Sequence, residues 1–184
     1  MSSFQKKQEI ADAFMEYFRK FGMKKTIVND VVKSLGMSKK TVYKYFKGGK
    51  EEALYYFFRK VADFYVKNLE DDLNSLPTAE KKLVYVLQQI YEISRPHIEA
   101  NVADEEDYVV ENEIVGSAFR DAYQNIVKKL LKIGMKTGEF KNIDVDLTIH
   151  LIYGMILESM KIIHQNHKRK IKDDVIDAVM KILQ

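Results

Sequence analysis

Apolar side chains recur at three- and four-residue steps along most of this chain, and that spacing constrains its fold more than any other feature. Such steps place residues on one face of an α-helix, which takes 3.6 residues per turn. The 184 residues include only two prolines and eight glycines, so few positions interrupt the helices. The sequence therefore predicts an all-α protein.

Composition also narrows the function classes. The chain has no cysteine, which excludes disulfide frameworks and Cys-based zinc or thiol chemistry. Its first residues lack the apolar core of a signal peptide, and the longest apolar stretch, Leu151–Leu157, is too short to span a bilayer. We expect a cytoplasmic protein without a membrane segment.

Positive charge is concentrated at one end. Residues 1–50 contain twelve lysines and arginines against four acidic residues, whereas residues 51–184 contain eighteen against twenty-three. A basic segment can be a solvated surface without a partner. A balance of +8 within 50 residues favours a polyanionic partner instead.

Three helices are predicted within this basic segment. The first ends at Gly22. The second is expected to be capped by Thr26 and to end at Gly36, and the third to begin at Ser38 and run through Phe46. Two short helices joined by a tight turn at a glycine are typical of a helix-turn-helix.

The third helix would present a polar outer face. If Val42 and Phe46 point inward, Lys40 and Lys44 lie on nearly the opposite side, with hydroxyl and phenol groups on the flanks. Lysines, hydroxyls and phenols of this kind contact phosphates and base edges when such a helix lies in the major groove. An ordinary three-helix unit with solvated lysines is the alternative.

The motif SLGMSKKTVYKYF, followed by KEEAL, resembles the N-terminal domain of TetR-type transcriptional regulators. The resemblance implies a helix-turn-helix DNA-binding domain at 1–49 and a ligand-binding and dimerisation domain at 50–184. It places Lys50 as a phosphate-contacting lysine at the start of the fourth helix. The positions that it implies contact operator DNA are Thr26, Ser38, Lys39, Lys40, Thr41, Tyr43, Lys44, Tyr45 and Lys50.

The remaining two thirds of the chain is predicted to form a helical bundle. One helix is expected to stop before Pro96, and the acidic run Asp104–Asp107 to form a solvated loop. The predicted helices span about 50–73, 79–95, 109–135, 147–163 and 175–183.

Segment 147–163 is apolar on almost every side, so part of its surface needs a second subunit. Gly154 would let two such helices approach closely. The resemblance implies the same, because TetR-type dimers pack their last two helices together. The residues predicted at this homodimer interface are Leu151, Gly154, Met155, Glu158, Val175 and Val179.

A small-molecule effector is also implied by the resemblance, and its identity is left open. Residues on the helices that usually line such pockets are Tyr91, Phe119, Tyr123 and Met155. Their Met and aromatic character suits a hydrophobic or planar ligand. The acidic residues Glu111 and Glu113 leave a cationic ligand possible. For the four lining residues, the alternative is that they only pack in the protein core.

No catalytic site is recognisable. His164 and His167 lie three residues apart but adjoin Lys168, Arg169 and Lys170, so surface histidines are favoured over a metal site. We therefore expect no enzyme, metal or cofactor. The sequence predicts a ligand-responsive repressor that binds palindromic double-stranded operator DNA as a homodimer. A helical protein-interaction module without specific DNA binding is the alternative.

Overall fold

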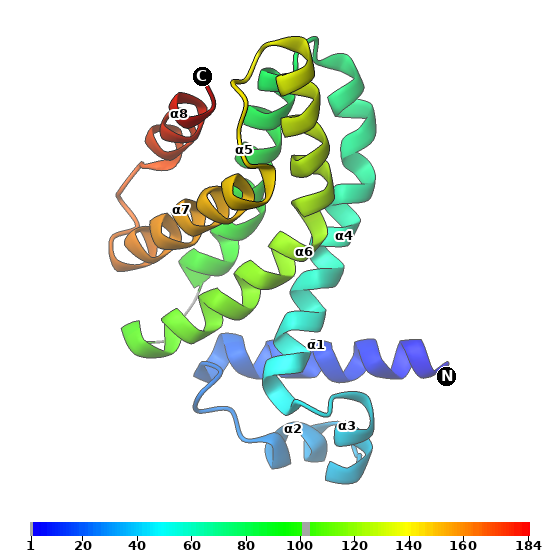
Figure 1. The fold of residues 1–184 in the computed structure, drawn as a ribbon. Coiled ribbons are helices and arrows are strands. Elements are labelled where there is room, and N and C mark those ends of the chain that lie inside the picture. Colours follow the sequence, from blue (N-terminus) through cyan, green and yellow to red (C-terminus); the bar gives the residue numbers. More distant parts are fainter. Residues whose placement is uncertain (1, 101–103) are drawn as a thin grey trace. The chain divides into compact units, whose positions relative to one another are not determined.

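The computed structural model describes residues 2–100 and 104–184, and within them it contains eight α-helices and no strand. The all-α prediction is confirmed (Figure 1). The helices are α1 (Ser3–Phe21), α2 (Val28–Ser34), α3 (Lys39–Tyr45), α4 (Gly49–Ser75), α5 (Ala79–Ala100), α6 (Glu105–Thr137), α7 (Val145–Gln165) and α8 (Lys172–Leu183).

The chain divides into two compact units. Residues 1–61 and 100–118 form the first unit, and residues 62–99 and 119–184 form the second. The predicted boundary after residue 49 coincides with the start of α4, whose first half packs within the first unit. The first unit also includes the beginning of α6, which sequence spacing gave no reason to expect. The functional division at residue 49 stays a prediction.

Helix α1 is defined at both ends by local interactions. Ser2 and Gln5 form a capping box at its start, in which each side chain accepts a hydrogen bond from the other residue's backbone N–H. Gly22 follows its last turn at φ 79°, a backbone conformation that favours glycine. The helix buries Ile10, Phe14 and Phe18 and so forms much of the core of the first unit.

Helix α5 corrects one prediction. It does not stop before Pro96 but continues through it to Ala100. Proline removes one backbone hydrogen bond and disfavours helical geometry in the preceding residue. Packing offsets this cost, because Ser94 and Ile98 on either side are both buried and the Ser94 hydroxyl donates to the carbonyl of Ile90 at 2.7 Å.

Helix α6 starts earlier than predicted. The run from Glu105 to Asp107 forms its first turn and not a loop. The Asp104 carboxylate accepts the N–H of Asp107 at 3.1 Å, and acidic side chains in a first turn are stabilised by the helix dipole. Residues 101–103 of the predicted acidic loop lie outside the described part of the chain.

The end of α6 was also predicted too early. The helix passes through Gly134 and ends at Thr137, before Gly138 at φ 76°. At Gly134 the ring of Phe140 lies directly against the helix backbone, where a Cβ would collide with three ring carbons. Gly134 thus permits close packing of the α6–α7 connection.

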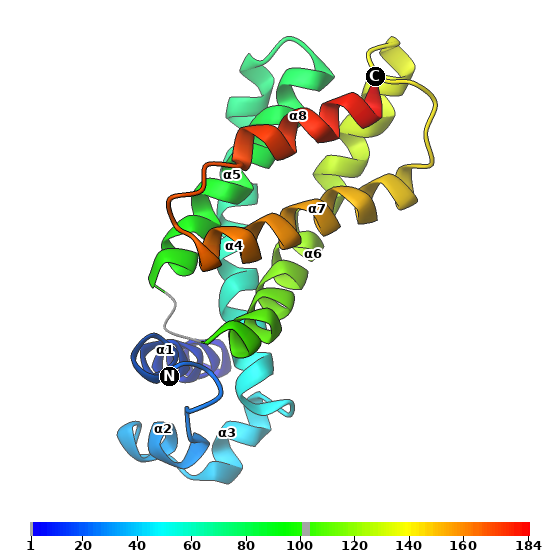
Figure 2. The same cartoon turned by 90° about the vertical axis from the view of Figure 1, so that its left-hand side faces the viewer.

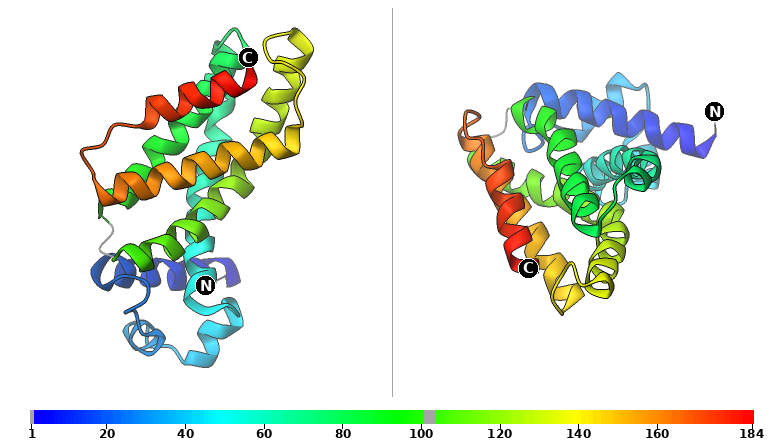
Figure 3. Two further views of the ribbon diagram at one scale, coloured as in Figure 1. Left: turned by 60° about the vertical axis from the view of Figure 1, so that its left-hand side comes forward. Right: turned by 90° about the horizontal axis from the view of Figure 1, so that it is seen from above.

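Helices α7 and α8 lie side by side in the second unit (Figures 2 and 3). Asp144 caps α7 by accepting the N–H of Leu147 at 3.0 Å, in accordance with the predicted helix start. One face of α7 is buried through Ile152, Ile156 and Met160. Among the residues the structure describes, no helix is long and apolar enough to cross a membrane.

We expect Gly134→Ala to lower the free energy of unfolding by roughly 1–3 kcal/mol, because the new methyl group overpacks the site against Phe140. Urea-induced unfolding at a fixed protein concentration would measure the change. The matched control is the same Gly134→Ala change in Phe140→Ala protein, where the added methyl group no longer meets the ring. An equal loss of stability with and without the Phe140 ring would contradict the packing argument.

Candidate DNA interface and ligand-binding core

The turn between α2 and α3 is fixed by backbone hydrogen bonds. The N–H of Gly36 donates to Lys33 at 3.1 Å, and the N–H of Met37 donates to Val32 at 2.9 Å. This pair is the Schellman motif, which requires a left-handed residue at Gly36, and its φ is 60°. The glycine predicted at this turn therefore sets the angle at which α3 leaves α2.

Helix α3 is oriented by the two residues predicted to point inward. Val42 and Phe46 are both fully buried. At its start the Ser38 side chain accepts the N–H of Thr41 at 3.1 Å, and the two hydroxyls are 2.8 Å apart. Their bonding caps the helix and leaves both residues at the surface, with Thr41 half-buried.

The exposed side of α3 carries the predicted base-reading groups. Lys39, Lys40 and Lys44 are exposed, Tyr43 is 39% exposed and Tyr45 is half-buried. The ammonium groups of Lys39 and Lys44 lie 5.9 Å from the rings of Tyr43 and Tyr45, respectively. These seven positions, from Ser38 to Tyr45 without Val42, thus form one basic and hydrogen-bonding surface.

Thr26 and Lys50 do not belong to that exposed surface. Thr26 does not cap α2, whose N-cap is Ile27; it is buried, and its hydroxyl donates to the carbonyl of Gly22 at 2.8 Å. The Lys50 ammonium donates to the carbonyls of Met23 and Lys24 at 2.8 and 3.1 Å. Both residues hold the loop between α1 and α2, and for Thr26 this geometry offers no free donor to a phosphate.

The same loop is held from the start of α6. The carboxylate of Glu111, which is buried, accepts the N–H of Met23 at 2.9 Å. Lys24 and Asp107 form a salt bridge at 3.0 Å, and hydrogen bonding to Asp107 raises the pKa of Lys24. Glu111 is thus a structural group of the first unit, which argues against its use for a cationic ligand.

Three of the four residues predicted to line a ligand pocket are buried in the second unit. Tyr91 donates to, or accepts from, the Ser159 hydroxyl at 2.5 Å, and Phe119 and Tyr123 stack with ring centroids 6.2 Å apart. Met155 is only half-buried, on the side of α7 nearer the surface. The structure therefore brings Phe119 and Tyr123 together and leaves Met155 outside the core.

Tyr153 is a core residue that the sequence analysis missed. Its side chain is 4% exposed, and neither its hydroxyl nor that of Tyr123 has a hydrogen-bond partner among the described residues. Burial raises the pKa of both phenols, and Tyr123 raises that of Tyr153 further. The apolar character of segment 147–163 concealed this polar group, although a tyrosine in such a run could have been singled out.

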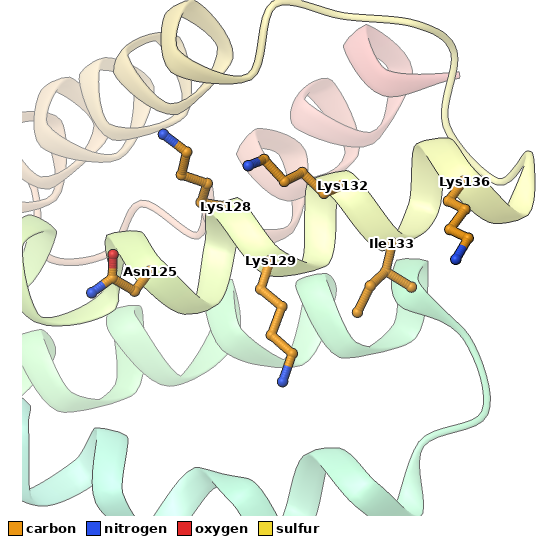
Figure 4. Close-up of a pocket in the computed structure, with 6 residues that line it drawn as sticks. All are labelled: Asn125, Lys128, Lys129, Lys132, Ile133 and Lys136. Atoms are coloured by element: carbon orange, nitrogen blue, oxygen red, sulfur yellow. The ribbon is translucent and has the colours of Figure 1, made fainter.

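Helix α6 also carries a lysine face, formed by Lys128, Lys129, Lys132 and Lys136. An open groove of about 410 Å³ lies along it, which Asn125 and Ile133 also line (Figure 4). Lys128 forms a salt bridge to Asp146 at 2.6 Å, and this interaction lowers the pKa of Asp146. Residues 122–138 contain no acidic side chain, so the rest of this surface is strongly positive.

The predicted dimer residues fall into two groups. Leu151, Gly154 and Glu158 are exposed along one stripe of α7, with Met155 and Val175 half-buried beside them. Val179 is fully buried within its own protomer and cannot form part of a surface interface. Two other exposed apolar side chains that sequence reasoning left out are Leu147 on α7 and Ile182 on α8.

His164 and His167, near the end of α7, contact one another edge to face, with ring centroids 6.0 Å apart. In the described part of the chain no three His, Cys, Asp or Glu side chains gather as a group that could hold a metal ion.

The geometry of the first unit defines a helix-turn-helix protein. Residues 10–56 match the family of bacterial regulatory proteins called the TetR family. The match covers the helix-turn-helix, so residues 10–56 form a TetR-type DNA-binding domain, and the all-α fold agrees with a transcriptional regulator of that type.

Individual relatives extend the similarity beyond the DNA-binding domain. The chain is 26% identical to the fatty acid metabolism regulator protein of Bacillus subtilis (strain 168) over 159 residues, which are 84% of this chain and 81% of that protein. Its fold is similar to that of the regulator FadR from Bacillus subtilis in complex with stearoyl-CoA, with a TM-score of 0.69, 22% identity and coverage of 96% and 99% of the two chains. RolR in complex with resorcinol has a TM-score of 0.76 at 14% identity, over 97% and 87% of the chains.

Replacing Lys40 or Lys44 by alanine should relax the base preference at one symmetric pair of operator positions. A lysine that reaches a guanine edge contributes about 1–3 kcal/mol of discrimination per base pair. Selection of binding sites from random DNA with each variant would reveal the changed consensus.

Val42→Ala is the control for this selection. Its side chain is buried, so its loss should lower stability while leaving the consensus unaltered. If both lysine variants keep the full wild-type consensus, the outer face of α3 does not read bases.

Proposed function

We propose that this protein is a homodimeric repressor whose operator binding is released by a long-chain fatty acyl-CoA. The observation that carries the proposal is the similarity to the fatty acid metabolism regulator of Bacillus subtilis, which extends over 84% of the chain and so includes the ligand-binding unit. The fold similarity to the regulator with bound stearoyl-CoA covers nearly the whole of both chains and supports the same ligand class.

Operator recognition follows from the exposed face of α3. Two copies of this helix, related by a two-fold axis, fit successive major grooves when they are separated by roughly 34–36 Å. Lys39, Lys40 and Lys44 have no acidic side chain within salt-bridge distance in the described structure, so they are available for DNA. The operator is accordingly a palindrome, and its affinity falls steeply as salt concentration rises.

The second unit has the chemistry to bind both ends of an acyl-CoA. A long acyl chain requires apolar walls, and the core between α5, α6 and α7 is rich in aromatic and aliphatic side chains. The headgroup of coenzyme A carries several phosphates. The lysine face of α6 supplies the complementary charge, and its self-repulsion would be relieved by a bound anion.

Release of DNA requires the ligand to bind one conformation better than another. Helix α6 supplies residues to both compact units, with Glu111 at the loop before α2 and the lysine face further along. A ligand that shifts α6 would either break the Glu111–Met23 hydrogen bond or displace the loop with it. Either result changes the position of α3.

We expect palmitoyl-CoA to raise the apparent Kd for operator DNA by about 5- to 150-fold, the usual range of coupling between two sites. Fluorescence anisotropy with a labelled operator would measure it. Free coenzyme A and resorcinol serve as comparison ligands and should have little effect. Operator binding that no acyl-CoA alters would rule out the proposed effector.

The lysine face provides a structural control for the same assay. Lys129→Gln combined with Lys132→Gln should weaken the response to palmitoyl-CoA and leave operator affinity without ligand unchanged. The matched variant is Lys168→Gln, an exposed lysine between α7 and α8 that should alter neither quantity. If the double variant responds like wild type, the headgroup binds elsewhere.

The dimer is proposed to form through the exposed apolar stripe of α7. Sedimentation equilibrium should give about twice 21.5 kDa for wild type, and Leu151→Glu should shift the protein towards monomer, because it places a charge in an apolar contact. Phe64→Glu is the control, since Phe64 is an exposed aromatic residue on α4 and lies outside this stripe. If the Leu151→Glu variant remains a dimer, the interface lies on another surface.

A further inference from the structure

Two buried phenol groups in the second unit lack an acceptor. Tyr123 on α6 is fully buried and Tyr153 on α7 is 4% exposed, and in the described structure neither hydroxyl has a hydrogen-bond partner. A buried donor without an acceptor destabilises the folded protein, because it has lost its hydrogen bond to water. Both positions could instead hold phenylalanine at similar volume, so the two hydroxyls do not follow from the needs of packing.

The Tyr123 phenol interacts electrostatically with the Tyr153 phenol. Burial is the main cause of the raised pKa of Tyr153, and Tyr123 raises it further, which places the two groups near one another. Tyr91 provides a contrast within the same core, because its hydroxyl is paired with that of Ser159 at 2.5 Å. Among the buried phenols of the second unit that the structure describes, Tyr123 and Tyr153 are therefore the ones without a partner.

We infer that the hydroxyls of Tyr123 and Tyr153 are a pair of hydrogen-bond donors for the thioester carbonyl of the effector. A carbonyl oxygen has two lone pairs and can accept from two donors at once. This inference rests on the proposed acyl-CoA function. It adds that the protein recognises the thioester carbonyl, which lies between the acyl chain and the headgroup.

The same pair favours a thioester over a free fatty acid. Both phenols remain neutral, and a carboxylate buried among them would need a counter-charge. Arg120 lowers the pKa of Tyr153, but Asp121, whose carboxylate lies 3.8 Å from the Arg120 guanidinium, acts on Tyr153 in the opposite direction. A neutral carbonyl can be buried there without such compensation.

The test compares Tyr123→Phe and Tyr153→Phe with Tyr85→Phe in the 184-residue chain. Removing an unpaired hydroxyl should raise the thermal unfolding midpoint of the ligand-free protein by about 1–4 °C and weaken palmitoyl-CoA binding about 3- to 10-fold. Tyr85→Phe removes a hydroxyl that donates to the Asp72 carboxylate at 2.7 Å, away from the proposed pocket, so it should lower the midpoint and keep the affinity. Isothermal titration calorimetry measures the affinity, and palmitate replaces palmitoyl-CoA in a parallel titration, where wild type should bind it more weakly.

The outcomes separate this inference from the proposed function. If wild type binds palmitoyl-CoA and both Phe variants bind it equally well, the carbonyl assignment is overturned and the acyl-CoA function stands. A lowered midpoint in Tyr123→Phe and Tyr153→Phe would also overturn it, because the hydroxyls would then have a structural partner in the free protein. Wild type that does not bind palmitoyl-CoA contradicts the proposed function itself.

Discussion

The backbone of Met23 is held from two sides, and the DNA-binding surface depends on this constraint. Its N–H donates to the buried carboxylate of Glu111, and its carbonyl accepts from the ammonium of Lys50. Met23 lies in the short loop between α1 and α2, so the two bonds fix where α2 begins. Because the Schellman turn at Gly36 then fixes α3 relative to α2, the orientation of α3 follows from the position of that loop.

This constraint changes how Lys50 is understood. The resemblance to TetR-type regulators implies a phosphate contact, and the structure adds a structural role, because two of its three donors are used on the carbonyls of Met23 and Lys24. One N–H of the ammonium is left over for a phosphate. A substitution at Lys50 would therefore weaken DNA binding through loss of loop geometry as well as loss of charge, and it would be a poor test of phosphate contact alone.

Local signals in the sequence predicted the first unit well, because they act over a few residues. Val42 and Phe46 are buried as their spacing requires, and Gly36 adopts the left-handed conformation expected at the turn. The errors came from interactions between distant parts of the chain. Pro96 stays helical because both sides of it are packed, and Thr26 turns inward to Gly22 where a cap was expected. Spacing alone also could not show which side of α8 meets α7, so Val179 was assigned to the surface.

The fold does not determine the effector, because its similar structures include one regulator with stearoyl-CoA and another with resorcinol. Which effector binds is therefore determined by the side chains within the fold. Resorcinol is a small aromatic ring with hydroxyl groups and needs no complement of positive charge, whereas an acyl-CoA has a long apolar chain, a neutral carbonyl and a polyanionic headgroup. Buried phenols that lack an acceptor match the carbonyl, and the lysine face of α6, where Lys128 is paired with Asp146, matches the phosphates. Because Tyr123 and the lysine face lie on α6, which also holds Met23 through Glu111, a helix that would contact the effector also positions the DNA-binding loop.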